Sequence, residues 1–301
     1  ERLGVAWRLE EIGAGPMSRL AASLGRLSAA HRALATTDAP LVVASGRQTV
    51  PLARAIARRP GKRPFTALLN PPAHGIGDFD LVWASAHDRV PAGSGNVVVT
   101  LTAPGRLSPE RLAEAARRFA PSVAHLPRPR VAVLVGGASR AYRFGRTEAE
   151  ELGTVLAGFA AANDASLLVT ASRRTGSENE RILAAKLAGT RAFLWDGTGE
   201  NPLAGMIGLA DALVVTCESI NMLSEAALSG RSLYAWPLPG GKGKFDRFHA
   251  ALVDAGAMRW FDGRLEFWSY PPLDATAVVA RAIAERMAKT GEAASRVGAP
   301  T

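Results

Sequence analysis

The feature that most constrains the fold of this 301-residue chain is an alternation between two kinds of segment. Short apolar runs rich in β-branched residues, bounded by glycine, proline or aspartate, are separated by longer segments rich in alanine and leucine. This alternation is typical of repeated βα units. Because the short runs are mostly apolar on both faces, they predict parallel strands with helices covering both sides of each sheet.

The predicted strands fall into two sets. The first set comprises residues 41–44, 65–69, 81–84 and 96–101, with helices expected near 51–58 and 108–119. The second set comprises residues 131–135, 166–170, 192–195, 212–216 and 232–236. Two Rossmann-like, doubly wound α/β domains with a cleft between them are therefore predicted.

The segment 121–130, which contains Pro121, Pro127 and Pro129, favours neither helix nor strand and is predicted to link the two sets. We predict an N-terminal domain over residues 1–125, a C-terminal domain over 126–289 and a flexible tail over 290–301. A helix-like stretch precedes the first convincing strand, so we expect that a first strand and its loop are missing from the N-terminal domain.

Composition narrows the function. A hydrophobic content of 48% supports large cores, and neither a membrane-spanning run nor a secretory signal is recognisable. The single cysteine suits a reducing compartment, so we expect a cytoplasmic protein. The formal net charge of +9 comes mainly from scattered arginines. It favours anionic substrates or an anionic membrane surface over nucleic acid; the arginine usage of a GC-rich genome is the alternative explanation.

Residues suited to phosphate follow two strands of the second set. Glycines at a strand end let backbone N–H groups approach an anion, and arginine forks match phosphate oxygens. The carboxyl ends of parallel strands face the ligand crevice of such folds. Turn glycines and solvated loop arginines are the alternative interpretation. The candidates are Gly136, Gly137, Ser139, Thr170, Ser172, Arg173, Arg174 and Thr175.

A third cluster follows the strand at 212–216. Glu218 and Ser219 come directly after it, and Ser219 can cap a helix whose positive end welcomes an anion. Glu225, further along that helix, can accept hydrogen bonds from a ribose diol, unless it is simply solvated or paired with an arginine. The glycine-rich segment at 239–249 brings Lys242 and Lys244 together, which indicates a diphosphate clamp.

The strands of the first set also end in polar residues, which would face the acceptor side of the same crevice. These are Ser45, Gly46, Arg47 and Asn70, together with His87 and Asp88. His87 and Asp88 are candidates for acid–base catalysis. Adjacent side chains on an extended segment point to opposite sides, however, so the two need not act together. The scattered histidines predict no metal site.

With these blocks in place, the chain resembles the bacterial relatives of the plant elongated-mitochondria fission factor, a family also labelled predicted nucleoside-diphosphate-sugar epimerases. The resemblance rests on Ser45 to Arg47, His87–Asp88, Ser172 to Thr175, Ser219 to Glu225 and Gly241 to Phe245. It implies a glycosyltransferase-B type of fold, in which Ser224 and Glu225 match a serine–glutamate pair that meets the ribose of a nucleotide sugar. Met222 lies in the same block. Glu218 stands where the family more often has aspartate.

Three functions follow from this resemblance. The first is an inverting, metal-independent glycosyltransferase that uses a nucleotide-diphosphate sugar as substrate, preferably of the uridine type, with no cofactor and with a membrane-linked acceptor at the inner membrane face. The second is a nucleotide-sugar 2-epimerase, which needs several carboxylates around the sugar. The third is a non-catalytic adaptor that retains the fold. The sequence carries no indication of the oligomeric state.

Overall fold

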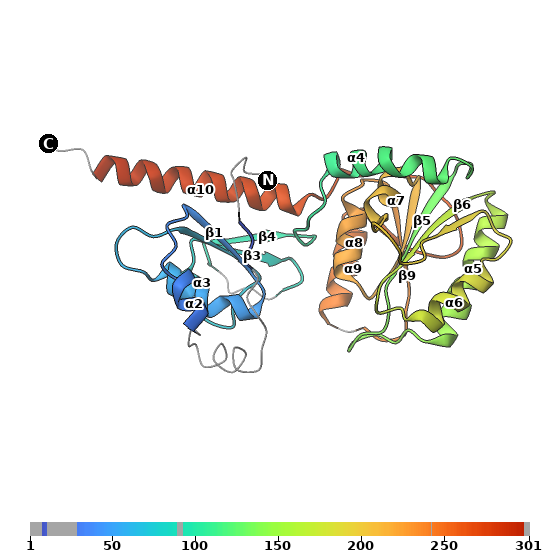
Figure 1. The fold of residues 1–301 in the computed structure, drawn as a ribbon, viewed down its shortest axis with the longest axis horizontal. Helices are drawn as coiled ribbons and strands as arrows, with labels where there is room; N and C mark the ends of the chain where they lie inside the picture. The colour runs from blue at the N-terminus through green and yellow to red at the C-terminus, as the bar shows by residue number, and fades with distance from the viewer. Residues whose placement is uncertain (1–7, 11–28, 89–92, 242, 298–301) are drawn as a thin grey trace. The chain divides into compact units, whose positions relative to one another are not determined.

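The computed structural model describes residues 8–10, 29–88, 93–241 and 243–297 (Figure 1). The chain divides into two compact units, one of Glu1–Thr100 with Thr276–Thr301 and one of Leu101–Ala275. Each unit is built around an all-parallel sheet, as the apolar character of the strands predicts.

The first unit contains a four-stranded sheet in the order β1-β2-β3-β4. Its strands are β1 (Leu41–Ser45), β2 (Phe65–Leu69), β3 (Leu81–Ser85) and β4 (Val97–Thr100). Helix α2 (Ala29–Leu34) precedes β1, and α3 (Val50–Ala57) and short 3₁₀ turns at Arg47–Thr49 and Ile76–Asp78 lie between the strands. Helix α10 (Ala275–Val297) lies on the opposite side of the sheet from α3 (Figure 1). Arg286 ties α10 to the carbonyl oxygens of Asp80 and Asn96.

The second unit contains a six-stranded sheet in the order β10-β9-β8-β5-β6-β7. Its strands are β5 (Arg130–Val135), β6 (Ser166–Ala171), β7 (Ala192–Leu194), β8 (Ala212–Thr216), β9 (Ser232–Trp236) and β10 (Met258–Trp260). Its helices are α4 (Pro109–Phe119), α5 (Arg146–Ala162), α6 (Ser177–Lys186), α7 (Leu203–Leu209), α8 (Ile220–Ala227) and α9 (Lys244–Asp254), with a 3₁₀ turn at Ala120–Val123. Helices α5 and α6 cover one face, and α7, α8 and α9 the other (Figure 1).

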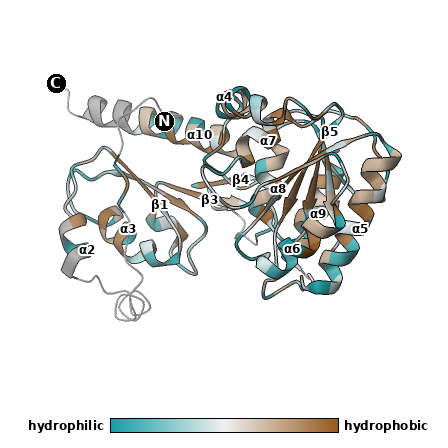
Figure 2. Ribbon diagram, turned by 45° about the vertical axis from the view of Figure 1, so that its right-hand side comes forward, coloured by the Kyte–Doolittle hydropathy of each residue, from teal (hydrophilic) through white to brown (hydrophobic). Residues whose placement is uncertain are grey.

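This strand order reverses between β5 and β8, because the chain leaves β5 toward β6 and β7 and then crosses back to β8. In doubly wound sheets such a switch point opens a crevice at the carboxyl ends of the two strands, where ligands bind. Strands β5, β6, β8 and β9 are buried almost throughout, and they are coloured brown in Figure 2 because their residues are hydrophobic. The core therefore fixes the positions from which the loops at the switch point start.

The predicted strands are all present, and those at 65–69, 212–216 and 232–236 have the predicted limits. Strand β10 was not predicted. It has only three residues, and two of them, Arg259 and Trp260, are exposed at the edge of the sheet. So short a run carries too little apolar pattern to be recognised.

Helix α4 belongs to the second unit because it packs very closely against α7. A Cβ added at Gly205 would lie 2.5 Å from Cβ of Phe119, and one added at Gly208 would lie 2.5 Å from the carbonyl oxygen of Leu112. Only glycine permits this approach. The predicted domain limits at residues 125 and 289 thus differ from the limits of the compact units, which lie at residues 100 and 275. Whether domains with the predicted limits fold independently stays a prediction.

The C-terminal end of the chain was predicted to be a flexible tail from residue 290. Helix α10 continues to Val297, and residues 298–301 lie beyond the part of the chain that the structure describes. The long helix has Val279 and Ile283 buried. Among the described residues, no helix combines the length and the apolar character that crossing a membrane requires.

Candidate functional site

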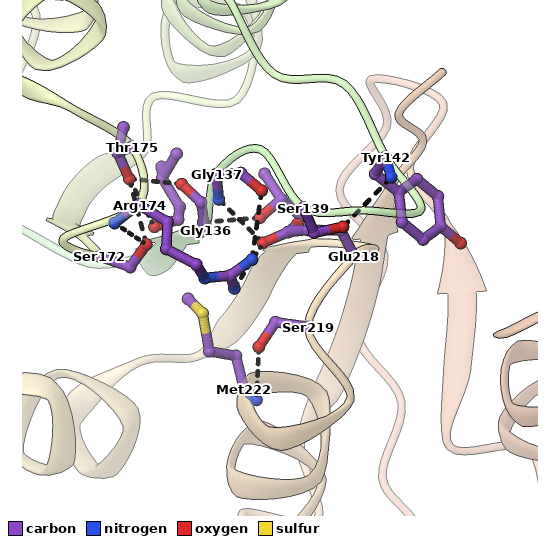
Figure 3. Close-up of polar contacts among 12 residues, drawn as sticks. Gly136, Gly137, Ser139, Tyr142, Ser172, Arg174, Thr175, Glu218, Ser219 and Met222 are labelled. Atoms are coloured by element: carbon purple, nitrogen blue, oxygen red, sulfur yellow. Dashed lines mark hydrogen bonds and ion pairs between the residues drawn. The ribbon is translucent and has the colours of Figure 1, made fainter. Parts of the chain in front are cut away.

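The loops that follow β5, β6 and β8 meet at the switch point of the second unit (Figure 3). Gly136 and Gly137 leave β5 and are both buried. The Gly136 N–H donates to Oγ1 of Thr216 at 2.7 Å, and the Gly137 N–H donates to Oε1 of Glu218 at 2.9 Å. The two amide groups predicted to face a phosphate are thus bonded to side chains of the chain itself.

Both glycines let neighbouring groups approach closely, and Gly137 admits no side chain because the group beside it is backbone. A Cβ at Gly136 would lie 1.5 Å from Oε1 of Glu218, and a Cβ at Gly137 would lie 2.1 Å from the carbonyl oxygen of Arg174. The glycines therefore serve the contact between the β5, β6 and β8 loops.

Glu218 is the most buried carboxylate of this region, with a side chain that is 0% exposed. Its Oε1 also lies 3.3 Å from Nη2 of Arg174, whereas Oε2 has no hydrogen-bond partner among the residues described. Burial raises the pKa of the Glu218 carboxyl, and the groups that oppose this include Thr216, the Gly137 N–H and Arg174. Ionised Glu218 is held by few donors for a buried charge.

Thr175 and Ser172 complete the junction between the β5 and β6 loops. The Thr175 hydroxyl donates to the carbonyl oxygens of Val135 and Gly136, and the Ser172 N–H donates to Val135 at 2.8 Å. These contacts position the turn that carries the two arginines. We call Gly136, Gly137, Arg174, Thr175, Thr216 and Glu218 the switch-point cluster.

Two further residues predicted to contact the ligand, Ser139 and Thr170, have structural roles within the second unit. Oγ of Ser139 accepts hydrogen bonds from the N–H groups of Ala141 and Tyr142, which closes a turn after β5. Thr170 lies inside β6 and is 4% exposed. Their contact with a nucleotide sugar stays a prediction.

Helix α8 begins at the carboxyl end of β8, and Ser219 is its N-cap, since its Oγ accepts from the Met222 N–H at 3.3 Å. The hydroxyl of Ser224 accepts from the Ala103 N–H at 3.0 Å, so it fixes the segment that enters the second unit. Glu225 is only partly exposed, and its carboxylate has no hydrogen bond or ion pair in the described structure. Burial alone raises its pKa.

Arg173 and Lys244 are the exposed cations predicted for the diphosphate. Arg173 makes no ion pair or hydrogen bond within the described ranges, in contrast to its neighbour Arg174. Lys244 is the first residue of α9, and its ammonium lies 5.6 Å from the centre of the Phe245 ring. Lys242 lies outside the described residues.

The polar residues predicted for the acceptor side all lie at the carboxyl edge of the first sheet. Ser45 ends β1, Gly46 follows it with φ at +92°, and Arg47 is exposed. Asn70 follows β2 with φ at +109°. After β3, Nδ1 of His87 lies 2.6 Å from Oγ of Ser85, and Oδ1 of Asp88 lies 3.9 Å from Nε2 of His87. The structure thus brings these residues to one sheet edge, and their roles stay predictions.

No sequence pattern marked Thr216, Tyr142 or His249 as residues near the site. Thr216 looked like the last residue of a strand, and only its pairing with Gly136 reveals its role. Tyr142, Cys217 and His249 line a pocket of about 260 Å³ beside α9. Burial raises the pKa of the Cys217 thiol to about 11 and lowers that of His249. Nowhere in the described ranges do three histidine, cysteine or acidic side chains gather as a metal site would require.

The sequence and the fold of the chain are both similar to those of known proteins. The chain is 29% identical over 280 residues to the mitochondrial fission protein ELM1 of Arabidopsis thaliana, an alignment that covers 84% of this chain and 65% of the plant protein. The chain therefore spans just under two thirds of the length of that relative.

Among solved structures, the UDP-GlcNAc 2-epimerase of Methanocaldococcus jannaschii is similar with a TM-score of 0.57 and 11% identity, over 94% of this chain and 88% of that one. MurG of Acinetobacter baumannii matches with a TM-score of 0.47 and 17% identity, over 94% of this chain and 77% of that one. Two Rossmann-like units with parallel sheets give this chain the glycosyltransferase-B type of fold. The family model described as mitochondrial fission ELM1 matches residues 1–287, and the chain belongs to this family.

Proposed function

We propose that the second unit binds a nucleoside diphosphate, with the ribose at Glu225 and the diphosphate between the start of α8 and Arg173. The observation that carries this proposal is the state of Glu225. It is half-buried on α8 and has no protein partner in the described structure. A carboxylate in this position accepts two hydrogen bonds from a vicinal diol without giving up an existing contact.

The proposed ligand also fits the charges nearby. The N-terminus of α8 points to the carboxyl edge of the sheet, where its positive end favours a phosphate. Arg173 is exposed and unpaired among the described residues, so it can bind phosphate oxygens without breaking an ion pair. The fold is shared with an enzyme whose name includes a uridine diphosphate sugar, and this supports the uridine type as the first ligand to test.

The reaction that we propose is transfer of the sugar from this donor by an inverting route, in which Arg173 and Lys244 stabilise the leaving diphosphate. A membrane-linked acceptor, and with it a place at the inner face of a membrane, is part of the same proposal. His87 and Asp88 are the acid–base candidates of the first unit.

Calorimetric titration tests the binding half of the proposal. We expect wild-type protein to bind uridine diphosphate, and Glu225→Gln to weaken this binding at least about tenfold, since a hydrogen bond to a charged group contributes about 1.5–3 kcal/mol. The same substitution should leave the affinity for inorganic pyrophosphate unchanged, because pyrophosphate has no ribose. Arg173→Ala should weaken both ligands.

Arg181→Ala and Glu178→Gln are the matched controls. Arg181 is an exposed arginine of α6, and Glu178 is an exposed carboxylate paired with Arg146. Neither should change the affinity for uridine diphosphate. Absence of binding by the wild-type protein to any nucleoside diphosphate would contradict the proposed function.

A non-catalytic adaptor is the second candidate, and one observation favours it. The Gly137 amide and Arg174, both predicted for phosphate, are occupied by Glu218. The family description names mitochondrial fission rather than a reaction. The epimerase candidate is supported by the shared fold alone. Production of an epimerised sugar nucleotide in the absence of an acceptor would nevertheless select it.

A further inference from the structure

The groups around Glu218 form an anion site that the chain fills by itself. Oε1 of Glu218 receives the Gly137 N–H at 2.9 Å and lies 3.3 Å from Nη2 of Arg174. A backbone N–H after a strand and a guanidinium are the donors that phosphate oxygens use at switch points. Glu218 thus occupies the place where a phosphate of the proposed ligand would find its donors.

The two donors differ in how firmly they hold the carboxylate. The Gly137 N–H is buried and is fixed by the close packing of its loop. The Arg174 side chain is 44% exposed, and both of its contacts, to Gly137 O and Glu218 Oε1, are 3.3 Å long. Hydrogen bonds of this length are weak. Arg174 is therefore the partner that can leave Glu218 and contact another anion.

Besides these two donors, the Thr216 side chain also stabilises the ionised form of Glu218. Oε2 of Glu218 has no partner among the described residues, and the side chain has no access to water. A buried charge that is poorly screened acts strongly on a neighbouring like charge.

We propose that Glu218 is an internal anion that determines how tightly this site holds phosphate, so that a diphosphate binds beside α8 by competing with Glu218 for Arg174. This inference rests on the proposed function for its ligand class. It makes Glu218 a residue that weakens the resting affinity of the site, with Arg174 as the cation shared between the carboxylate and the ligand. The site then releases diphosphate readily, because Glu218 takes Arg174 back.

The test uses inorganic pyrophosphate in calorimetry on the full chain. Glu218→Gln keeps the length of the side chain and removes its charge. We expect this variant to bind pyrophosphate at least about tenfold more tightly than the wild type, since placing like charges close together is strongly unfavourable. Glu178→Gln removes an exposed carboxylate instead and should change the affinity less than about twofold.

A double substitution isolates the role of Arg174. Combining Arg174→Ala with Glu218→Gln should remove the gain, and Arg174→Ala alone should have a much smaller effect than it has in the Glu218→Gln background. If Glu218→Gln does not fold, Glu218→Ser removes the same charge and takes its place. Pyrophosphate affinity that is equal or lower without the Glu218 charge, or a gain that persists without Arg174, would overturn the inference.

Titration with uridine diphosphate distinguishes a failure of this inference from a failure of the proposed function. If the wild type binds uridine diphosphate and the loss of the Glu218 charge brings no gain for either ligand, the inference is wrong and the proposed function stands. If uridine diphosphate binds no better than pyrophosphate in every variant, while Glu218→Gln strengthens pyrophosphate binding, the proposed nucleoside site is wrong and the role of Glu218 stands.

Discussion

Two pairs of residues with the same chemistry lie on the same loops of the second unit and are used in opposite ways. Arg174 and Glu218 contact each other within the switch-point cluster. Arg173, which directly precedes the first of them, and Glu225, on the helix that follows the second, have no partner in the described structure. In the structure the first pair is engaged within the chain, whereas the second pair has no contact that a ligand would have to displace.

The difference shows that residue type and position at a strand end do not by themselves identify a ligand contact. Parallel strands bring several loops to one edge, and those loops need their own hydrogen bonds before they can offer any to a ligand. In this chain the buried members, Glu218 and Thr175, serve the loops. The more exposed members remain available. Burial and existing hydrogen-bond partners therefore distinguish structural residues from candidate ligand contacts better than the sequence does.

The largest expected effect is a loss of stability when the switch-point cluster is disrupted at Gly137. In Gly137→Ala the added Cβ meets the backbone carbonyl of Arg174, which lies 2.1 Å from its ideal position. A backbone atom cannot move aside as a flexible side chain can, so we expect a loss of roughly 3 kcal/mol in the free energy of unfolding. Urea denaturation measures it.

Gly158 supplies the matched control for that substitution. It lies in α5, and nothing lies within 4 Å of the Cβ that alanine would add there. Gly158→Ala should stabilise the protein by about 0.5–1 kcal/mol, since glycine is unfavourable inside a helix. Similar stabilities for the two variants would show that the β5 and β6 loops do not pack as closely as described.

A smaller effect is expected from Thr216→Val, which keeps the shape of the side chain and removes the acceptor of the Gly136 N–H. This amide is buried and would lose its partner, so we expect a loss of about 1–3 kcal/mol. Thr154→Val on the exposed face of α5 is the control, because that hydroxyl only bonds to the carbonyl of Glu150. Thermal unfolding of both variants gives the comparison, and equal midpoints would contradict the role assigned to Thr216.

The sequence predicted much of this arrangement for a physical reason. Strands such as 212–216 are apolar throughout because helices cover both faces of the sheet, and that pattern is visible in the residues alone. The loops that carry the candidate site follow directly from those strands. The prediction could therefore identify which loops matter.

The sequence could not show how those loops pair with one another. Arg173 and Arg174 are adjacent and chemically equal, and the turn in which the Thr175 N–H donates to Ser172 O determines which of them reaches Glu218. Ser224 is held by the Ala103 N–H, a contact between distant parts of the chain. Such long-range pairings depend on tertiary packing, which local patterns do not record.

The smallest expected effect is a pH-dependent change in the free energy of unfolding when Glu225, which has no partner in the described structure, is replaced. Burial raises the pKa of Glu225 in the folded protein above its value in the unfolded chain, so the folded state binds the proton more tightly. The stability that this contributes is present below the unfolded pKa and is lost as pH rises through the folded pKa. Glu225→Gln lacks this dependence, so its stability relative to wild type should increase between pH 4 and pH 7. We expect a gain of at most about 0.5 kcal/mol for this partly exposed group.

Melting curves recorded between pH 4 and pH 7 test this expectation, with Glu178→Gln as the control. A stability of Glu225→Gln relative to wild type that falls with rising pH would mean that Glu225 has an unrecognised cationic partner.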